Sequence, residues 1–208
     1  MAIELEWTNF FKFITAASPI FVSLFFIMES SFNASFRGFA WGIGILLTQI
    51  IGMGLRAAPF MKKFGLRDHL KYKPNRAPND NERMPELCSI FDDPFYPEYA
   101  APSTHGVFHA FTLMYIILGV AKNPTTQGIT FIITLSMLGA LDFAFRIWRK
   151  CEKWTHFLMG AVIGAVAGWG WYTAVYLVDP KLTYFGPEDN MKKCRMGKQN
   201  FVCSYKKI

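Results

Sequence analysis

Five long apolar stretches divide this chain, and they restrict its fold more than any other feature of the sequence. The hydrocarbon core of a bilayer is about 30 Å thick, and a helix of about 20 predominantly apolar residues spans it. Each stretch is long enough for this and contains few charged residues. The predicted membrane helices cover residues 10–28, 39–60, 103–121, 129–148 and 154–178. We therefore predict an all-α fold, a polytopic membrane bundle of about five transmembrane helices.

The composition agrees with an integral, multi-pass membrane protein. Hydrophobic residues make up 52% of the 208 residues and aromatic residues 17%, which is too apolar for an ordinary soluble domain of this size. We predict a single membrane domain over residues 1–178. Membrane lipids are expected partners and nucleic acid is not. Which membrane holds the protein stays open.

Two polar segments interrupt the apolar pattern, a loop over residues 61–101 and a C-terminal tail over residues 179–208. With five helices, the N-terminus, this loop and the turn before residue 154 share one side of the membrane, which we call the loop side. The loop side is rich in Lys and Arg, which predicts that it is cytoplasmic. A basic site for phosphate would produce the same excess, so the orientation stays open.

Two of the four cysteines lie in the tail, in the sequence Cys194-Arg-Met-Gly-Lys-Gln-Asn-Phe-Val-Cys203. The spacing, with a glycine near the middle, suits a hairpin closed by a disulfide better than a metal site, which usually has CxxC spacing. We predict a disulfide between Cys194 and Cys203. The alternative is two free thiols.

All four histidines are placed on the loop side by this topology, and two of them lie in short motifs. Pro102-Ser103-Thr104-His105 opens a membrane helix and resembles PSGH, the second motif of the type 2 phosphatidic acid phosphatase superfamily. One helix later, Lys150 stands six residues before His156, which resembles the third motif of that family. In the polar loop, Arg76 and Arg83-Met84-Pro85 resemble its first motif.

This resemblance implies a membrane-bound hydrolase of lipid or isoprenoid phosphates that needs neither metal nor cofactor. Such an enzyme transfers the phosphoryl group to an imidazole, while a second imidazole protonates the departing alkoxide and cations neutralise the phosphoryl oxygens. By resemblance His156 is the nucleophile and His105 the acid. The implied phosphate-binding residues are Arg76, Arg83, Ser103, Thr104 and Lys150.

The family places an aspartate four residues after the nucleophile, where this chain has Gly160. Gly160 instead begins a stripe of glycines that lets membrane helices approach closely. Asp142 is a candidate replacement that would hold the His156 ring, although it could equally form a local pair with Arg146. His109 lies one turn after His105 and is a candidate supporting residue.

Two functions remain open at this point. The first is the phosphatase, and the second is a catalytically inactive relative that serves as a structural subunit, with other protein subunits, of a virion or organelle membrane. A zinc site built from His105, His109, His156 and Cys88 is disfavoured, because an HxxxH pair without a carboxylate or CxxC partner is a poor ligand signal. The basic residues could also form a surface patch for anionic lipid.

Overall fold

The computed structural model describes residues 7–57, 101–148, 152–186, 193–196 and 201–204. These residues contain five long helices, namely α1 (Trp7–Phe32), α2 (Arg37–Ala57), α5 (Thr104–Lys122), α6 (Thr126–Trp148) and α7 (Trp154–Val178). All five are long and apolar enough to cross a membrane. The predicted all-α bundle of five membrane helices is therefore confirmed. Most of the polar loop that we predicted over residues 61–101 lies outside the described residues.

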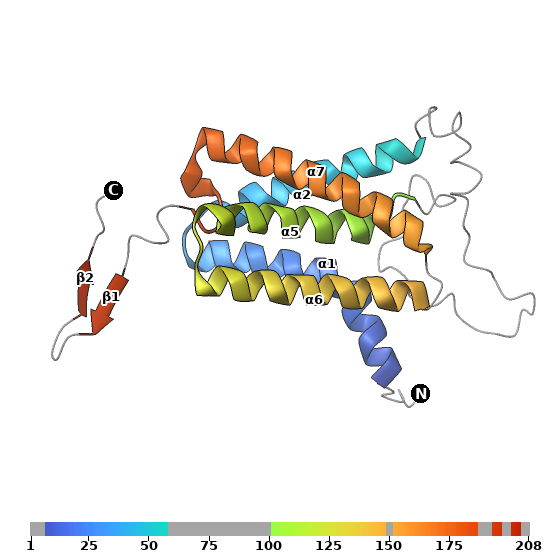
Figure 1. The fold of residues 1–208 in the computed structure, drawn as a ribbon, viewed down its shortest axis with the longest axis horizontal. Helices are drawn as coiled ribbons and strands as arrows, with labels where there is room; N and C mark the ends of the chain where they lie inside the picture. Colours follow the sequence, from blue (N-terminus) through green and yellow to red (C-terminus); the bar gives the residue numbers. More distant parts are fainter. Residues whose placement is uncertain (1–6, 58–100, 149–151, 187–192, 197–200, 205–208) are drawn as a thin grey trace, which may run out of the picture.

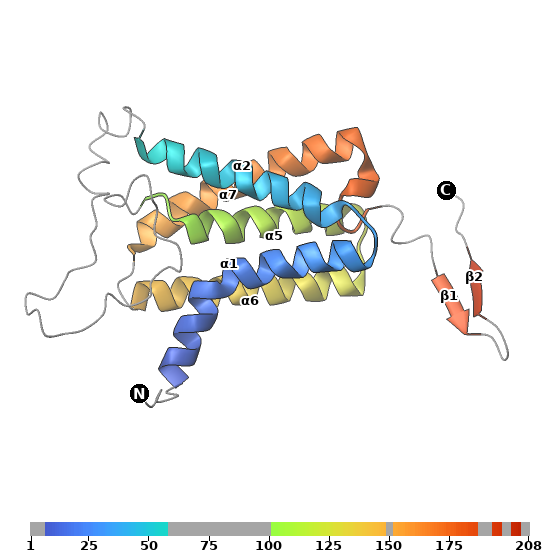
Figure 2. The ribbon, with the colours of Figure 1, turned by 180° about the vertical axis from the view of Figure 1, so that it is seen from behind.

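The helices run beside one another, with α5 in the centre of the bundle (Figures 1 and 2). Helix α5 is the most buried of the five, and it packs against each of the other four. The start of α5, the end of α6 and the start of α7 lie at one end of the bundle, on the right in Figure 1. We call this the loop end and the other the opposite end.

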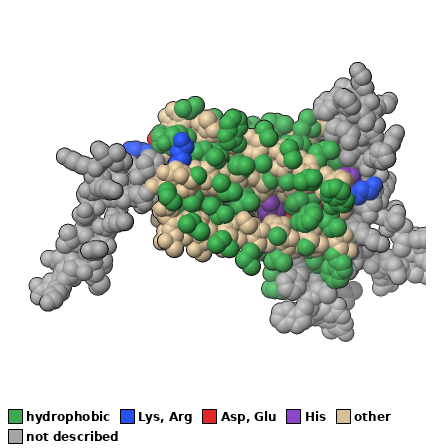
Figure 3. Space-filling view, in the orientation of Figure 1, with side chains coloured by type: hydrophobic (Ala, Val, Ile, Leu, Met, Phe, Trp, Pro, Cys, Tyr) green, Lys and Arg blue, Asp and Glu red, His purple; other side chains and the backbone are tan. Residues whose placement is uncertain are grey.

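Aromatic side chains fill the core, while apolar side chains also cover its outer surface. Phe26 and Trp41 are fully buried and stack with ring centroids 4.4 Å apart. Leu46, Val166 and Trp169 are among many large apolar residues that face outward. Figure 3 shows hydrophobic side chains over the face in view, with Lys and Arg near its two ends. This distribution suits a bundle surrounded by lipid, because the hydrocarbon region excludes exposed polar groups.

Helices α5 and α7 touch through their backbones along the glycine stripe. A Cβ atom at Gly160 would collide with the carbonyl oxygen of Ser103, and one at Gly164 would collide with that of Val107. The close approach brings the starts of α5 and α7 together. It also explains why residue 160 is glycine, because an aspartate there would force the two helices apart.

Helix α1 bends part-way along its length, as Figure 2 shows, and Pro19 lies inside it. A proline has no backbone N–H, so the carbonyl oxygen of Thr15, four residues earlier, loses its helical partner. The hydroxyl of Ser18 donates to that oxygen over 2.9 Å. The sequence of α1 thus places a serine with a fixed hydroxyl direction inside the bundle.

The chain beyond α7 packs back onto the opposite end of the bundle. The short helix η1 (Pro180–Leu182) leads to Tyr184, which is 7% exposed and contacts the ring of Phe26 edge-on. The packed unit therefore extends to Gly186, past the boundary at residue 178 that we predicted. Asp179 begins η1 by accepting from the backbone N–H of Lys181.

Two short strands of the tail, β1 (Lys193–Met196) and β2 (Phe201–Ser204), pair in an antiparallel hairpin. The register sets Cys194 directly opposite Cys203. Opposite residues in such a pair have Cα atoms about 4.5–5.5 Å apart, a separation that a disulfide can bridge. The side chains of the hairpin lie outside the described residues, so the disulfide stays a prediction.

Candidate functional site

The two histidine motifs meet at the loop end. The backbone N–H of Ser103 donates to the carbonyl oxygen of His156 over 3.1 Å. The Ser103 hydroxyl caps α5 by accepting from the N–H of Gly106, also over 3.1 Å. His156 is 1% exposed. Segments that are about fifty residues apart in sequence thus form one structural unit.

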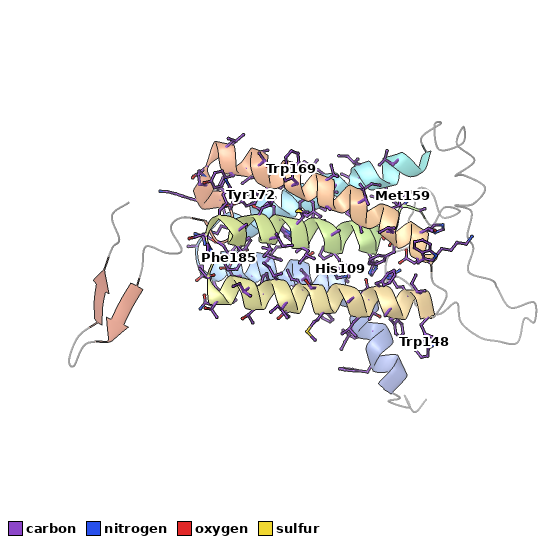
Figure 4. All side chains as sticks on the ribbon, viewed as in Figure 1. His109, Trp148, Met159, Trp169, Tyr172 and Phe185 are labelled. Atoms are coloured by element: carbon purple, nitrogen blue, oxygen red, sulfur yellow. The ribbon has the colours of Figure 1, made fainter. Side chains whose placement is uncertain are left out.

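A fully buried carboxylate, that of Asp142 on α6, links the two histidines of α5. Its Oδ2 accepts from Nδ1 of His105 over 2.8 Å and from Nε2 of His109 over 3.1 Å. Figure 4 shows His109 in the space between α5 and α6. His109 is five residues into α5, so the cluster lies about 8 Å along the helix from the loop end.

Hydrogen-bond partners fix the proton positions on both rings. The single hydrogen of the Ser18 hydroxyl goes to a backbone carbonyl, so its oxygen accepts from Nε2 of His109 over 3.2 Å. Nε2 of His109 is therefore a donor, shared between Ser18 and Asp142. Nδ1 of His105 donates to the carboxylate, which leaves a lone pair on its Nε2. No group of the described residues hydrogen-bonds that Nε2.

The second oxygen of Asp142 begins a chain of buried ion pairs. Its Oδ1 accepts from Nε of Arg146 over 3.2 Å, and Nη1 of Arg146 donates to Oε1 of Glu152 over 3.2 Å. Glu152 follows α6 and precedes α7, and its carboxyl also interacts with the Ser103 hydroxyl. Burial raises the pKa of Glu152, although the Arg146 charge and the Ser103 hydroxyl limit the rise.

The charges of this network do not balance. Asp142, Arg146 and Glu152 are 0%, 7% and 6% exposed. Two buried carboxylates and one buried guanidinium therefore meet here, and these three groups sum to −1 when they are ionised and the histidines are neutral. A buried net charge is expensive at membrane depth and is usually retained for a function.

The structure brings together several residues that the sequence singled out. Ser103 and His156 meet at the loop end, and Asp142 joins His105 to His109 over the first two turns of α5. Thr104 is partly buried, and its carbonyl oxygen accepts from the Gln49 side chain. Arg76, Arg83, Cys88 and Lys150 lie outside the described residues.

The sequence suggested two roles for Asp142, to hold the His156 ring or to pair with Arg146. Its carboxylate holds the His105 ring, and the hydrogen bonds found for its two oxygens go to His105, His109 and Arg146. These bonds therefore do not support the idea that Asp142 replaces the missing aspartate beside His156. The pair with Arg146, the alternative interpretation, is present.

Sequence reasoning missed two members of the network, Ser18 and Glu152. Ser18 stands in an apolar run, where only the following Pro19 hints at a special role. Glu152 is the one acidic residue in the basic turn Arg149-Lys150-Cys151-Glu152-Lys153. That isolation was a usable signal, because an acidic residue among bases is a natural partner for a buried arginine.

An apolar crevice lies beside the network, between α1 and α6. It is lined by Thr15, Leu141, Ala144, Phe145 and Trp148. Leu141 is the neighbour of Asp142, and Thr15 is one turn before Ser18. The crevice lies on the outer side of the bundle, because Leu141 and Trp148 are exposed.

No family model matches this chain, and no curated protein or solved structure was found to match it.

Proposed function

We propose that this protein hydrolyses a lipid or isoprenoid phosphate without a metal, using His105 and His156 as the reacting imidazoles. The observation that carries the proposal is the Asp142 carboxylate on Nδ1 of His105, at the point where the two motifs meet. A carboxylate on one ring nitrogen fixes the tautomer and leaves the other nitrogen as a base or nucleophile.

The proposed reaction has two steps. Nε2 of His105 attacks phosphorus, the bond from phosphorus to the lipid oxygen breaks, and the alkoxide takes a proton from His156. Water then attacks the phosphohistidine, gives up a proton to the second imidazole and releases inorganic phosphate. These roles reverse those that the resemblance implies, because the Asp142 carboxylate is hydrogen-bonded to Nδ1 of His105 and leaves its Nε2 available.

Two further features support a lipid substrate with an anionic headgroup. The N-termini of α5 and α7 both face the loop end, and helix N-termini attract phosphate. The crevice between α1 and α6 is lined by apolar side chains and suits a hydrocarbon chain. Arg76, Arg83 and Lys150 would supply positive charge, and their placement stays a prediction.

The test is turnover of phosphatidate and of an isoprenyl phosphate by purified protein in detergent with excess chelator. We expect release of inorganic phosphate, inhibition by vanadate, and a loss of at least about 100-fold in His105→Gln and in His156→Gln. Thr134→Val, on the exposed side of α6, is the matched control and should keep full activity.

Trapping the intermediate decides the roles. Protein mixed with labelled substrate and quenched in base should carry phosphohistidine at position 105. Label at position 156 would restore the roles implied by the resemblance and keep the hydrolase. No turnover and no label with any lipid phosphate would reject the enzyme.

One observation favours the second candidate, an inactive relative that serves as a structural subunit of a membrane assembly. Arg146 and the Ser103 hydroxyl are suited to bind phosphate, yet both interact with the Glu152 carboxyl. The Glu152 carboxylate then binds the groups that a substrate phosphate would otherwise contact. In this case the wild-type protein shows no more turnover than His156→Gln, and both fold equally well.

A further inference from the structure

Three potential metal ligands converge on one point inside the bundle. One ligand atom from each of His105, His109 and Asp142 lies within 4.8 Å of the other two, and all three side chains are buried. The carboxylate comes from α6 and the imidazoles from successive turns of α5. The HxxxH pair thus has the carboxylate partner whose absence argued against a metal when only the sequence was considered.

We propose that His105, His109 and Asp142 form a binding site for a divalent transition-metal ion of the kind that prefers imidazole, with Zn²⁺ as the probe. Two imidazoles and one carboxylate are a ligand set found for such ions, with the fourth position open to water or hydroxide. The proposal goes beyond the hydrolase and does not depend on it.

The distances need only modest change to accept the ion. Ligand atoms at about 2.0–2.1 Å from tetrahedral zinc are about 3.3 Å apart. The Asp142 oxygen is 2.8 Å from one imidazole nitrogen and 3.1 Å from the other. An ion would replace the two imidazole protons that now bridge these atoms. The distances from the Asp142 oxygen to the two nitrogens would then lengthen slightly.

The surroundings favour a cation at this point. The three buried groups Asp142, Arg146 and Glu152 sum to −1 when ionised, and a divalent ion that carries a hydroxide would neutralise this charge. Arg146 binds the carboxylate oxygen that faces away from the imidazoles, so it orients the ligand without occupying its metal-binding oxygen. A proton on one of the imidazoles is the competing way to balance the charge.

The ion would also change His105. With a metal on Nδ1, the proton moves to Nε2, and the lone pair that the proposed hydrolysis requires is lost. Zinc is therefore expected to inhibit turnover if the hydrolase exists. Binding of zinc can be measured whether or not the protein turns over any substrate, so the two proposals fail independently.

The experiment measures zinc binding to protein freed of metal by chelator, with any affinity tag removed. Calorimetric titration and metal analysis should give a zinc-binding component in the wild type that weakens at least about 100-fold in Asp142→Asn and in His109→Gln. His156→Gln is the matched control and should keep it, because His156 is not one of the three ligands. Elution as a folded species by size exclusion is required of each variant, and His109→Gln alone carries the test if Asp142→Asn does not fold.

Unchanged zinc affinity in folded His109→Gln would overturn the proposal, since any zinc bound would then sit elsewhere in the chain. Absence of zinc binding in the wild type would overturn it as well and would assign the missing positive charge to a proton. A visible spectrum typical of tetrahedral cobalt in the wild type, lost in His109→Gln, would independently support it.

Discussion

The two ends of the bundle bury polar groups in different ways. At the opposite end the Tyr184 hydroxyl lies 2.9 Å from Oε2 of Glu29, 3.2 Å from the carbonyl oxygen of Phe26 and 3.3 Å from the Ser30 hydroxyl. Burial raises the pKa of Tyr184, so the phenol stays neutral. At this end, Tyr184 connects the chain after α7 to α1. The one carboxylate in this group, that of Glu29, is only half-buried and is contacted by neutral donors.

The loop end buries ionised groups instead. Asp142, Arg146 and Glu152 form two ion pairs around one guanidinium, and three buried histidines lie beside them. Ion pairs in a dry interior rarely repay their desolvation, so such a network adds little to stability. The difference indicates that the polar groups of the opposite end stabilise the fold, whereas the buried ion pairs of the loop end are retained for a function despite their desolvation cost.

The largest expected effect comes from removing the one guanidinium of the network. Arg146→Met leaves the buried carboxylates of Asp142 and Glu152 without the guanidinium that they share, which should lower the free energy of unfolding by about 3–5 kcal/mol. Arg37→Met is the matched control at the opposite end, where the guanidinium donates to a backbone carbonyl near the surface, and should cost under about 1 kcal/mol. Unfolding in detergent with increasing denaturant measures both. Equal losses would erase the proposed difference between the two ends.

A smaller effect is expected at the opposite end from the loss of one hydroxyl. Tyr184→Phe keeps the packing against Phe26 but leaves the buried polar neighbours of the hydroxyl with one donor fewer. This should lower the free energy of unfolding by about 1–2 kcal/mol. Tyr176→Phe is the control, because Tyr176 is only partly buried and its ring contacts Tyr172 and Lys122. The same unfolding assay should show almost no change for it. A negligible loss in Tyr184→Phe would mean that this end is held by apolar packing alone.

The fold was predictable because each of its causes is local in sequence. A membrane helix needs an uninterrupted apolar run, and five such runs are visible without knowledge of their packing. The stripe Gly160, Gly164 and Gly168 also signals a close helix contact from its four-residue spacing. What it does not reveal is the partner, and the structure identifies α5 through the carbonyl oxygens of Ser103, Val107 and Phe111.

The candidate site was predictable only in part. Short motifs pointed to His105 and His156, and the meeting of their segments follows from the predicted topology. The hydrogen-bond partner of the Asp142 carboxylate could not be predicted from the sequence, because it depends on how α6 is rotated about its axis relative to α5. A rotation of about 100° separates one residue from the next, so a small difference in packing decides whether Asp142 faces a histidine or the lipid.

The smallest effect tests whether the negative charge of the loop end is truly unbalanced. A carboxyl whose pKa is raised by burial stabilises the fold when it is protonated, and that contribution is lost as the pH rises from the ordinary value for glutamate, about 4.3, through the raised value. Glu152→Gln resembles the protonated acid and keeps an oxygen for Nη1 of Arg146. We therefore expect the variant to be more stable than the wild type at pH 7, with the difference vanishing below about pH 4. Unfolding curves across this pH range, with and without added zinc, measure it. If Glu152→Gln is instead less stable at pH 7 without metal, the ionised Glu152 is balanced by a further cation, and the charge count that distinguishes the two ends has to include an additional positive group.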